Sequence, residues 1–175
     1  MKKTIILSLA ICLFYMFVSA MTVESLEIPS DAIRIRIIPN SNSSYDQKIK
    51  SKVKDRLETS LYDLLKDAEN SDEAKKLIKN NLNIVEKDIE NVFTSEKYNL
   101  GYEVSFGYNY FPKKKYKGVK YKEGYYESLL VTLGEGKGNN WWCVLYPPLC
   151  LIETDEAKNI EYKSFVKEIL SKYFQ

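Results

Sequence analysis

Short segments rich in apolar and aromatic residues predict β-strands, most clearly where apolar and polar residues alternate. The first reads Ile-Arg-Ile-Arg-Ile, so we expect a half-exposed strand, and Pro39 to Ser43 ends it. A lysine-rich turn separates the next two long segments. The predicted strands are Ile33–Ile37, Gly101–Phe111, Val119–Tyr121, Tyr125–Leu133 and Trp141–Tyr146.

Other segments repeat apolar residues at a spacing of three and four, which predicts amphipathic helices. Ser44 and Gln47 fit a capping box before the first helix, whose stripe runs from Ile49 to Leu65. The second helix begins near Ser71 and Asp72 and extends to Phe93. The last is expected over Lys158 to Phe174.

The order of these elements is strand, two helices, several strands and a final helix. Strands linked by hairpins and separated from the helices predict an α+β fold. We expect an antiparallel sheet of about four to five strands, with three helices packed mainly on one face. The length of 175 residues favours one domain, over residues 31–175, after a linker at 21–30.

Residues 1–20 have the order of an export signal. Lys2 and Lys3 precede an almost entirely apolar segment, and Val18-Ser19-Ala20 suits cleavage after Ala20. An uncleaved membrane anchor is the alternative, although the apolar segment is shorter than the about 20 residues of a spanning helix. We expect an extracytoplasmic protein.

The charge balance argues against nucleic acid as a partner. The whole chain has net charge +2, and Lys2 and Lys3 supply it, so residues 21–175 sum to zero. A neutral domain has no overall field to hold phosphate backbones. Cys143 and Cys150 remain after removal of Cys12 with the leader, and an even pair in an exported domain suggests a disulfide, with two buried thiols as the alternative.

The chain has 0 histidines, which excludes histidine-dependent nucleophilic catalysis and zinc sites built on imidazole. The acidic residues mostly mix with lysines on predicted helix faces, so we expect no enzyme activity, metal or cofactor. The glycines from Gly134 to Gly138 suggest a phosphate-binding loop, but no Gly-Lys-Ser/Thr ending or helix follows. A glycine-rich hairpin turn is the better interpretation.

Two surfaces are candidates for binding. A basic patch around Lys113 to Lys122, interleaved with Tyr116 and Tyr121, suits an anionic membrane surface or wall polymer, or is a hairpin tip. The other is an aromatic and proline-rich segment in which two successive tryptophans must face opposite sides of a strand. Its expected partner-interface residues are Trp141, Trp142, Tyr146, Pro147 and Pro148.

Four segments resemble the stage II sporulation protein R family of endospore-forming Firmicutes. They are Ile33 to Ser43, Asp46-Gln47 followed by Lys50 and Val53 to Asp55, Tyr125 to Leu129 and, most specifically, the seventeen residues from Gly134 to Cys150. The resemblance implies an intercellular signal made in the forespore and exported into the space between the two sporulation membranes. It also implies a partner, the membrane-embedded aspartic protease of the mother cell (stage II sporulation protein GA), which processes pro-sigma-E. The alternative function is an exported wall-binding or membrane-surface binding module.

Overall fold

The computed structural model describes residues 12, 14, 28–116, 119–149 and 162–173. Its strands are β1 (Ile33–Ile38), β2 (Tyr102–Phe111), β3 (Lys114–Tyr116), β4 (Val119–Tyr121), β5 (Gly124–Leu133) and β6 (Trp141–Tyr146). Its helices are α2 (Ser44–Leu65), α3 (Ser71–Asn80), α4 (Leu82–Glu96) and α5 (Tyr162–Tyr173). The α+β class is confirmed, and every predicted strand is present.

The four-stranded sheet has the order β2-β5-β1-β6. β1 is parallel to β5 and antiparallel to β6, while β2 is antiparallel to β5. The predicted antiparallel sheet is therefore wrong in one respect, because this sheet is mixed. The three helices between β1 and β2 carry the chain away from β1, so β1 need not form a hairpin with its sheet neighbours.

β1 is central, and the expectation of a half-exposed strand is wrong. Ile33, Ile35 and Ile37 face the helices and are fully buried. On the other side Arg34 is also buried, with only 2% of its surface exposed, and Arg36 is partly exposed. An arginine in an alternating pattern normally indicates solvent, but here aromatic rings of neighbouring strands cover it.

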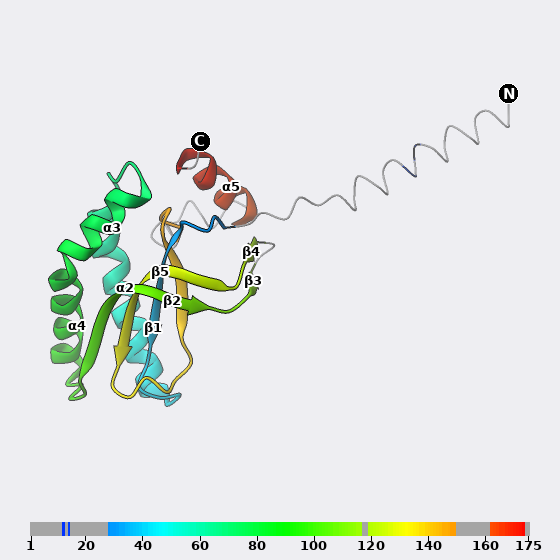
Figure 1. Ribbon diagram of the computed structural model, residues 1–175. Helices are drawn as coiled ribbons and strands as arrows, with labels where there is room; N and C mark the ends of the chain where they lie inside the picture. The colour runs from blue at the N-terminus through cyan, green and yellow to red at the C-terminus, as the bar shows by residue number, and fades with distance from the viewer. Residues whose placement is uncertain (1–11, 13, 15–27, 117–118, 150–161, 174–175) are drawn as a thin grey trace, which may run out of the picture.

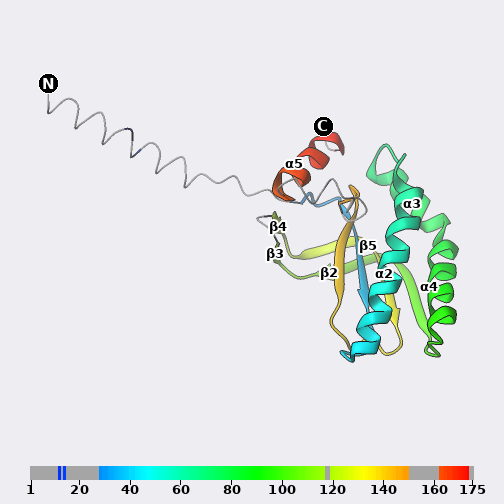
Figure 2. The same cartoon turned by 180° about the vertical axis from the view of Figure 1, so that it is seen from behind.

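The helices α2, α3 and α4 form a layer on one face of this sheet (Figures 1 and 2). The first helix starts one residue earlier than expected: the Ser43 side chain caps it by accepting a hydrogen bond from the Asp46 N–H, at 3.1 Å. The predicted second helix is two helices, α3 and α4. They separate at Asn81, whose side-chain amide donates to the Leu77 carbonyl instead of pointing to solvent.

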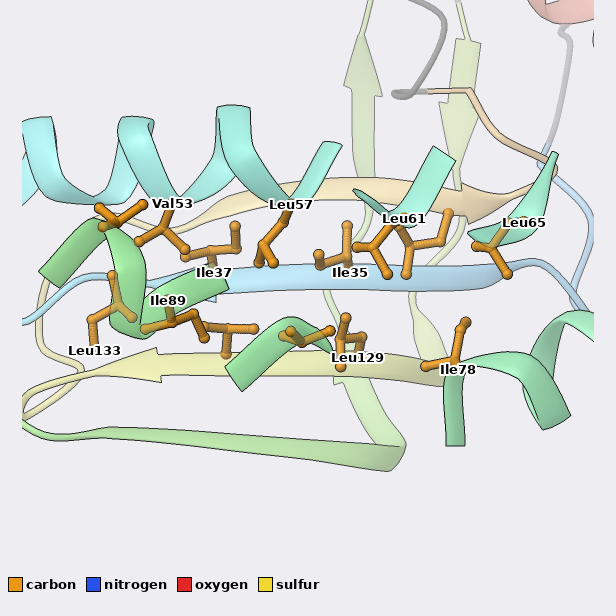
Figure 3. Packing of buried hydrophobic residues seen from close by; sticks show 14 of the residues in the cluster. Ile35, Ile37, Val53, Leu57, Leu61, Leu65, Ile78, Ile89, Leu129 and Leu133 are labelled. Atoms are coloured by element: carbon orange, nitrogen blue, oxygen red, sulfur yellow. The ribbon is translucent and has the colours of Figure 1, made fainter. Parts of the chain in front are cut away.

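The main hydrophobic core lies between this helical layer and the sheet. Figure 3 shows Val53, Leu57, Leu61 and Leu65 of α2 directed at the isoleucines of β1, while side chains of β5, α3 and α4 complete the packing. Each such side chain contributes about 1.5–3 kcal/mol when it is fully buried. This core keeps the sheet rigid. A binding residue on the face opposite the helices, which we call the second side, therefore has a fixed support.

The hairpin β3–β4 extends the β2–β5 pair away from the helical layer (Figure 1). A second, smaller hydrophobic cluster joins this hairpin to β6 and α5 through Val119, Val144, Leu149 and Val166. The last helix therefore packs mainly on a different cluster from α2–α4, contrary to the expectation of three helices on one face. Residues 158–161 and 174 of the predicted helix lie outside the described residues.

Candidate interaction surfaces

Trp141 and Trp142 lie on opposite sides of β6, as the strand pattern predicts. Trp141 packs against the main core on the helix-facing side, and the Lys54 ammonium lies 5.8 Å from its ring centroid. Trp142 pairs with Arg36 across the sheet and lies on the second side. Both side chains are partly exposed, so each borders solvent as well as packed neighbours.

The Trp142 ring lies among one aromatic and two cationic side chains. Its centroid is 5.0 Å from that of Phe111, in an edge-to-face arrangement. The Arg36 guanidinium carbon lies 4.4 Å from the ring, and the Lys114 ammonium lies 4.9 Å from it. A partly exposed indole beside two cations suits recognition of a protein group that is both apolar and acidic.

Tyr146, Pro147 and Pro148 are buried, and this corrects their place in the expected interface. Only 1% of the Tyr146 surface is exposed; its hydroxyl donates to the Ala68 carbonyl at 3.2 Å, and burial raises the pKa of Tyr146 to about 12. Its ring packs edge-to-face on Tyr173 of α5. Aromatic residues next to prolines occur both in interfaces and under a packed terminal helix, and the sequence alone does not separate the two.

Cys143 is partly buried in β6 and takes part in a disulfide bond. Its expected partner, Cys150, lies outside the described residues. The bond supports the expected pairing, and the identity of the partner remains a prediction.

Arg34 is a buried cation that sequence reasoning does not find. Its guanidinium carbon lies 3.4 Å from the Tyr126 ring centroid, 5.1 Å from that of Phe111 and 6.0 Å from that of Tyr121. Burial lowers the pKa of Arg34. Within the described part of the chain, its Nε and Nη2 have no hydrogen-bond acceptor. In the sequence, the only sign of this aromatic cluster around Arg34 is the series of aromatic residues at alternating positions of β2 and β5.

A second exposed surface is the tyrosine–lysine ribbon, which we define as residues 108–116 and 119–127. Tyr108, Tyr110 and Tyr125 are 71%, 48% and 72% exposed, and the Tyr110 and Tyr125 rings lie 5.7 Å apart. Lys115 and Lys120 are exposed cross-strand neighbours farther along the same ribbon. The basic patch expected from the sequence is thus joined to exposed tyrosines.

The segment from Gly134 to Gly138 is not a hairpin turn, because the strands that it connects, β5 and β6, lie on either side of β1. It crosses the end of β1 and is fixed to the loop that follows β1. The amides of Lys137 and Gly138 donate to the carbonyls of Asn40 and Pro39, both at 3.0 Å. A Cβ at Gly138 would overlap the Ser41 carbonyl, so glycine is required there for close packing.

The Asp46 carboxylate fixes the conformation of the loop that follows β1. It accepts hydrogen bonds from the Ser41 hydroxyl at 2.5 Å, the Tyr98 hydroxyl at 2.7 Å and the Asn40 amide at 3.0 Å. The Ser41 bond is the main reason that the pKa of Asp46 falls to about 2. These contacts use the polar residues of both loops for structure, so neither loop is a candidate phosphate site.

The described residues contain no group of three or more histidine, cysteine, aspartate or glutamate side chains placed to hold a metal ion. Among them, no helix has the length and apolar character needed to cross a bilayer.

The family model described as stage II sporulation protein R matches residues 29–156. The chain belongs to this family. Stage II sporulation protein R of Bacillus subtilis (strain 168) is 35% identical over 138 residues, which cover 79% of this chain and 62% of that relative. The chain thus matches less than two thirds of the relative's length. No solved structure matches the chain.

The part that matches the stage II sporulation protein R family contains the whole four-stranded sheet, the helices α2–α4 and both candidate surfaces. α5, which covers Tyr146, lies beyond the matched residues. Membership of the family supports a role in sporulation.

Proposed function

We propose that this protein is an exported signal of sporulation that activates a membrane-embedded aspartic protease, stage II sporulation protein GA, in the mother cell. The protease then processes pro-sigma-E. Membership of the stage II sporulation protein R family carries this proposal. The protein acts between the two sporulation membranes and works by contact, without catalysis of its own, cofactor or nucleic acid.

We propose Trp142 and its neighbours on the second side of the sheet as the contact site. Trp142 is partly exposed, and the cations of Arg36 and Lys114 surround its ring. A rigid aromatic anchor of this kind can supply about 2 kcal/mol or more of binding free energy. Trp141 borders solvent on the opposite side and is the secondary candidate.

Co-expression in a non-sporulating host tests the proposal. The protein is produced with an export signal, together with the cognate protease and pro-sigma-E, and cleavage of pro-sigma-E is followed by immunoblotting. We expect cleavage only when all three are present. Equal cleavage without this protein would contradict the activator role.

The competing function is an exported module that binds a wall polymer or a membrane surface and carries no signal. The exposed tyrosines and lysines of the tyrosine–lysine ribbon favour it. The same co-expression separates the two functions, because such a module would leave pro-sigma-E uncleaved.

A further inference from the structure

The tyrosine–lysine ribbon has an inner and an outer side. Phe111 and Tyr126 lie on the inner side against Arg34, and Tyr121 is directed to the same guanidinium. Because successive side chains of a strand point to opposite faces, the residues next to these inner residues point outward. The outer side therefore presents Tyr108, Tyr110, Tyr125, Lys115 and Lys120.

Positive charge is concentrated on this ribbon. The net charge of residues 21–175 is zero. Residues 112–124 contain six lysines and one glutamate, so the rest of residues 21–175 has a net charge of −5. Of these lysines, the described ones, Lys113, Lys114, Lys115, Lys120 and Lys122, are all exposed. A neutral domain with one strongly basic end is oriented by a charged surface, with that end toward negative charge.

The three tyrosines suit a boundary between apolar and polar surroundings. Each places a ring outside the packed core and a hydroxyl at its tip, and tyrosine is enriched where a bilayer meets water. The Tyr110 hydroxyl donates to the Glu123 carboxylate at 3.3 Å, and Glu127, the cross-strand neighbour of Tyr108, is paired with Lys75 and Lys79 of α3. The outer side of the ribbon thus carries both exposed tyrosine rings and exposed ammonium groups.

We propose that the outer side of the tyrosine–lysine ribbon binds the surface of an anionic phospholipid bilayer. Lysines attract anionic headgroups from several ångströms away, and the tyrosine rings enter the interfacial region beside them. A protein partner is less well matched, because lysine is depleted in protein interfaces. The inference does not rest on the proposed signalling function.

Vesicle co-sedimentation tests this proposal. Protein exported by a heterologous host, with the same N-terminus in every variant, is mixed with sucrose-loaded vesicles of phosphatidylglycerol and phosphatidylethanolamine, or of phosphatidylcholine alone. We expect binding to the anionic vesicles that weakens as salt is raised. Lys115→Ala with Lys120→Ala should lower the partition coefficient about thirtyfold, since each lysine near the surface contributes about a factor of five.

Matched variants on the helical layer provide the controls. Lys76→Ala with Lys87→Ala removes the same charge from exposed sites on α3 and α4, and should leave vesicle binding unchanged. Tyr108→Ala with Tyr125→Ala should weaken binding, whereas Tyr62→Ala, at an exposed tyrosine of α2, should not. Thermal melts confirm that each variant is folded.

Three results would overturn the proposal. They are equal binding to both kinds of vesicle, equal loss of binding in the ribbon and control variants, and no vesicle binding by the unaltered protein. If the unaltered protein does not bind vesicles and the ribbon variants lose pro-sigma-E cleavage, the ribbon is assigned to a protein partner. Vesicle binding that depends on the ribbon, with no cleavage in any combination, would retain this proposal and contradict the signalling function.

Discussion

The guanidinium of Arg34 lies over the ring of Tyr126, with 3.4 Å between the guanidinium carbon and the ring centroid. A desolvated cation–π contact contributes about 2 kcal/mol, whereas taking a guanidinium out of water costs several kcal/mol. The contact therefore offsets only part of the cost of burying this charge. The rest of the contribution of Arg34 to stability comes from its buried aliphatic stem and from the packing of the rings around that stem.

Replacing Arg34 should separate its charge from its volume. Arg34→Met keeps most of the volume and removes the buried charge, so we expect the free energy of unfolding to stay within about 1 kcal/mol or to rise. Arg34→Ala also removes the packing and should lower it by about 2–4 kcal/mol. Urea denaturation of both variants measures this. An equal loss in Arg34→Met would mean that the charge has a partner of its own.

Asp46→Asn should destabilise the protein in a pH-dependent way. The folded-state pKa of about 2 is below the ordinary value of 3.8, so ionised Asp46 stabilises the fold by about 2.5 kcal/mol above pH 5. That contribution disappears as the pH falls from about 4 towards 2. We expect the difference between the unaltered protein and the variant to be full at pH 7 and small near pH 2.

Urea unfolding at a series of pH values checks the Asp46 prediction, with Asp63→Asn as control. Asp63 is an exposed side chain that forms an ion pair with exposed Lys66, at 3.2 Å, so its replacement should change stability by less than about 0.5 kcal/mol. A pH-independent loss in Asp46→Asn would show that shape, not charge, is what the loop requires.

Gly138→Ala should destabilise the protein by about 2 kcal/mol or more, because the new methyl group meets the backbone of Ser41, which cannot rotate away. Gly107→Ala is the matched control. A Cβ there has no neighbour within 4 Å, and the change should be within about 0.5 kcal/mol. Thermal melts compare the two. Similar melting temperatures would contradict close packing between the two loops.

The two tryptophans should separate folding from signalling. Trp141→Ala removes packing from the main core and should cost about 3 kcal/mol of stability. Trp142→Ala should cost about 1–2 kcal/mol, since it loses Phe111 and Arg36 contacts, and should abolish pro-sigma-E cleavage. If a folded Trp142→Ala variant activates fully, the partner binds elsewhere.

If Cys143 and Cys150 form the predicted disulfide, reduction should free the thiols of these two residues. Alkylation followed by mass spectrometry should show two additional modified cysteines after reduction, whichever N-terminus the protein carries. Peptide mapping then assigns the bond. Modification of both cysteines before any reductant is added would leave two free thiols as the correct description.

Helices and strands could be predicted from the sequence because their apolar residues repeat with different periods. The order of the strands in the sheet could not be predicted. Alternation along β1 is the same whether its neighbour is parallel or antiparallel. The position of β1 between β5 and β6 depends on contacts between residues far apart in the chain. The break at Asn81 is also hidden, because apolar spacing continues across it from Leu77 to Val85.

Exposure in the candidate sites was the least predictable property. Tyr146 and Tyr125 are both aromatic strand residues, yet one is buried under α5 and the other is exposed on the ribbon. What decides is whether a later element packs over the strand. The opposite directions of Trp141 and Trp142, by contrast, follow from strand geometry alone.

The central place of β1 also constrains the order in which the sheet can be assembled. β1 is the earliest strand of the sheet, and its two neighbours, β5 and β6, are the last. Pairing between distant parts of a polypeptide slows folding, so the growing chain holds β1 unpaired until the later strands have been synthesised. A product ending before Trp141 would leave one edge of β1 open, and an open apolar edge promotes aggregation. Only a polypeptide made through Tyr146 can complete this sheet.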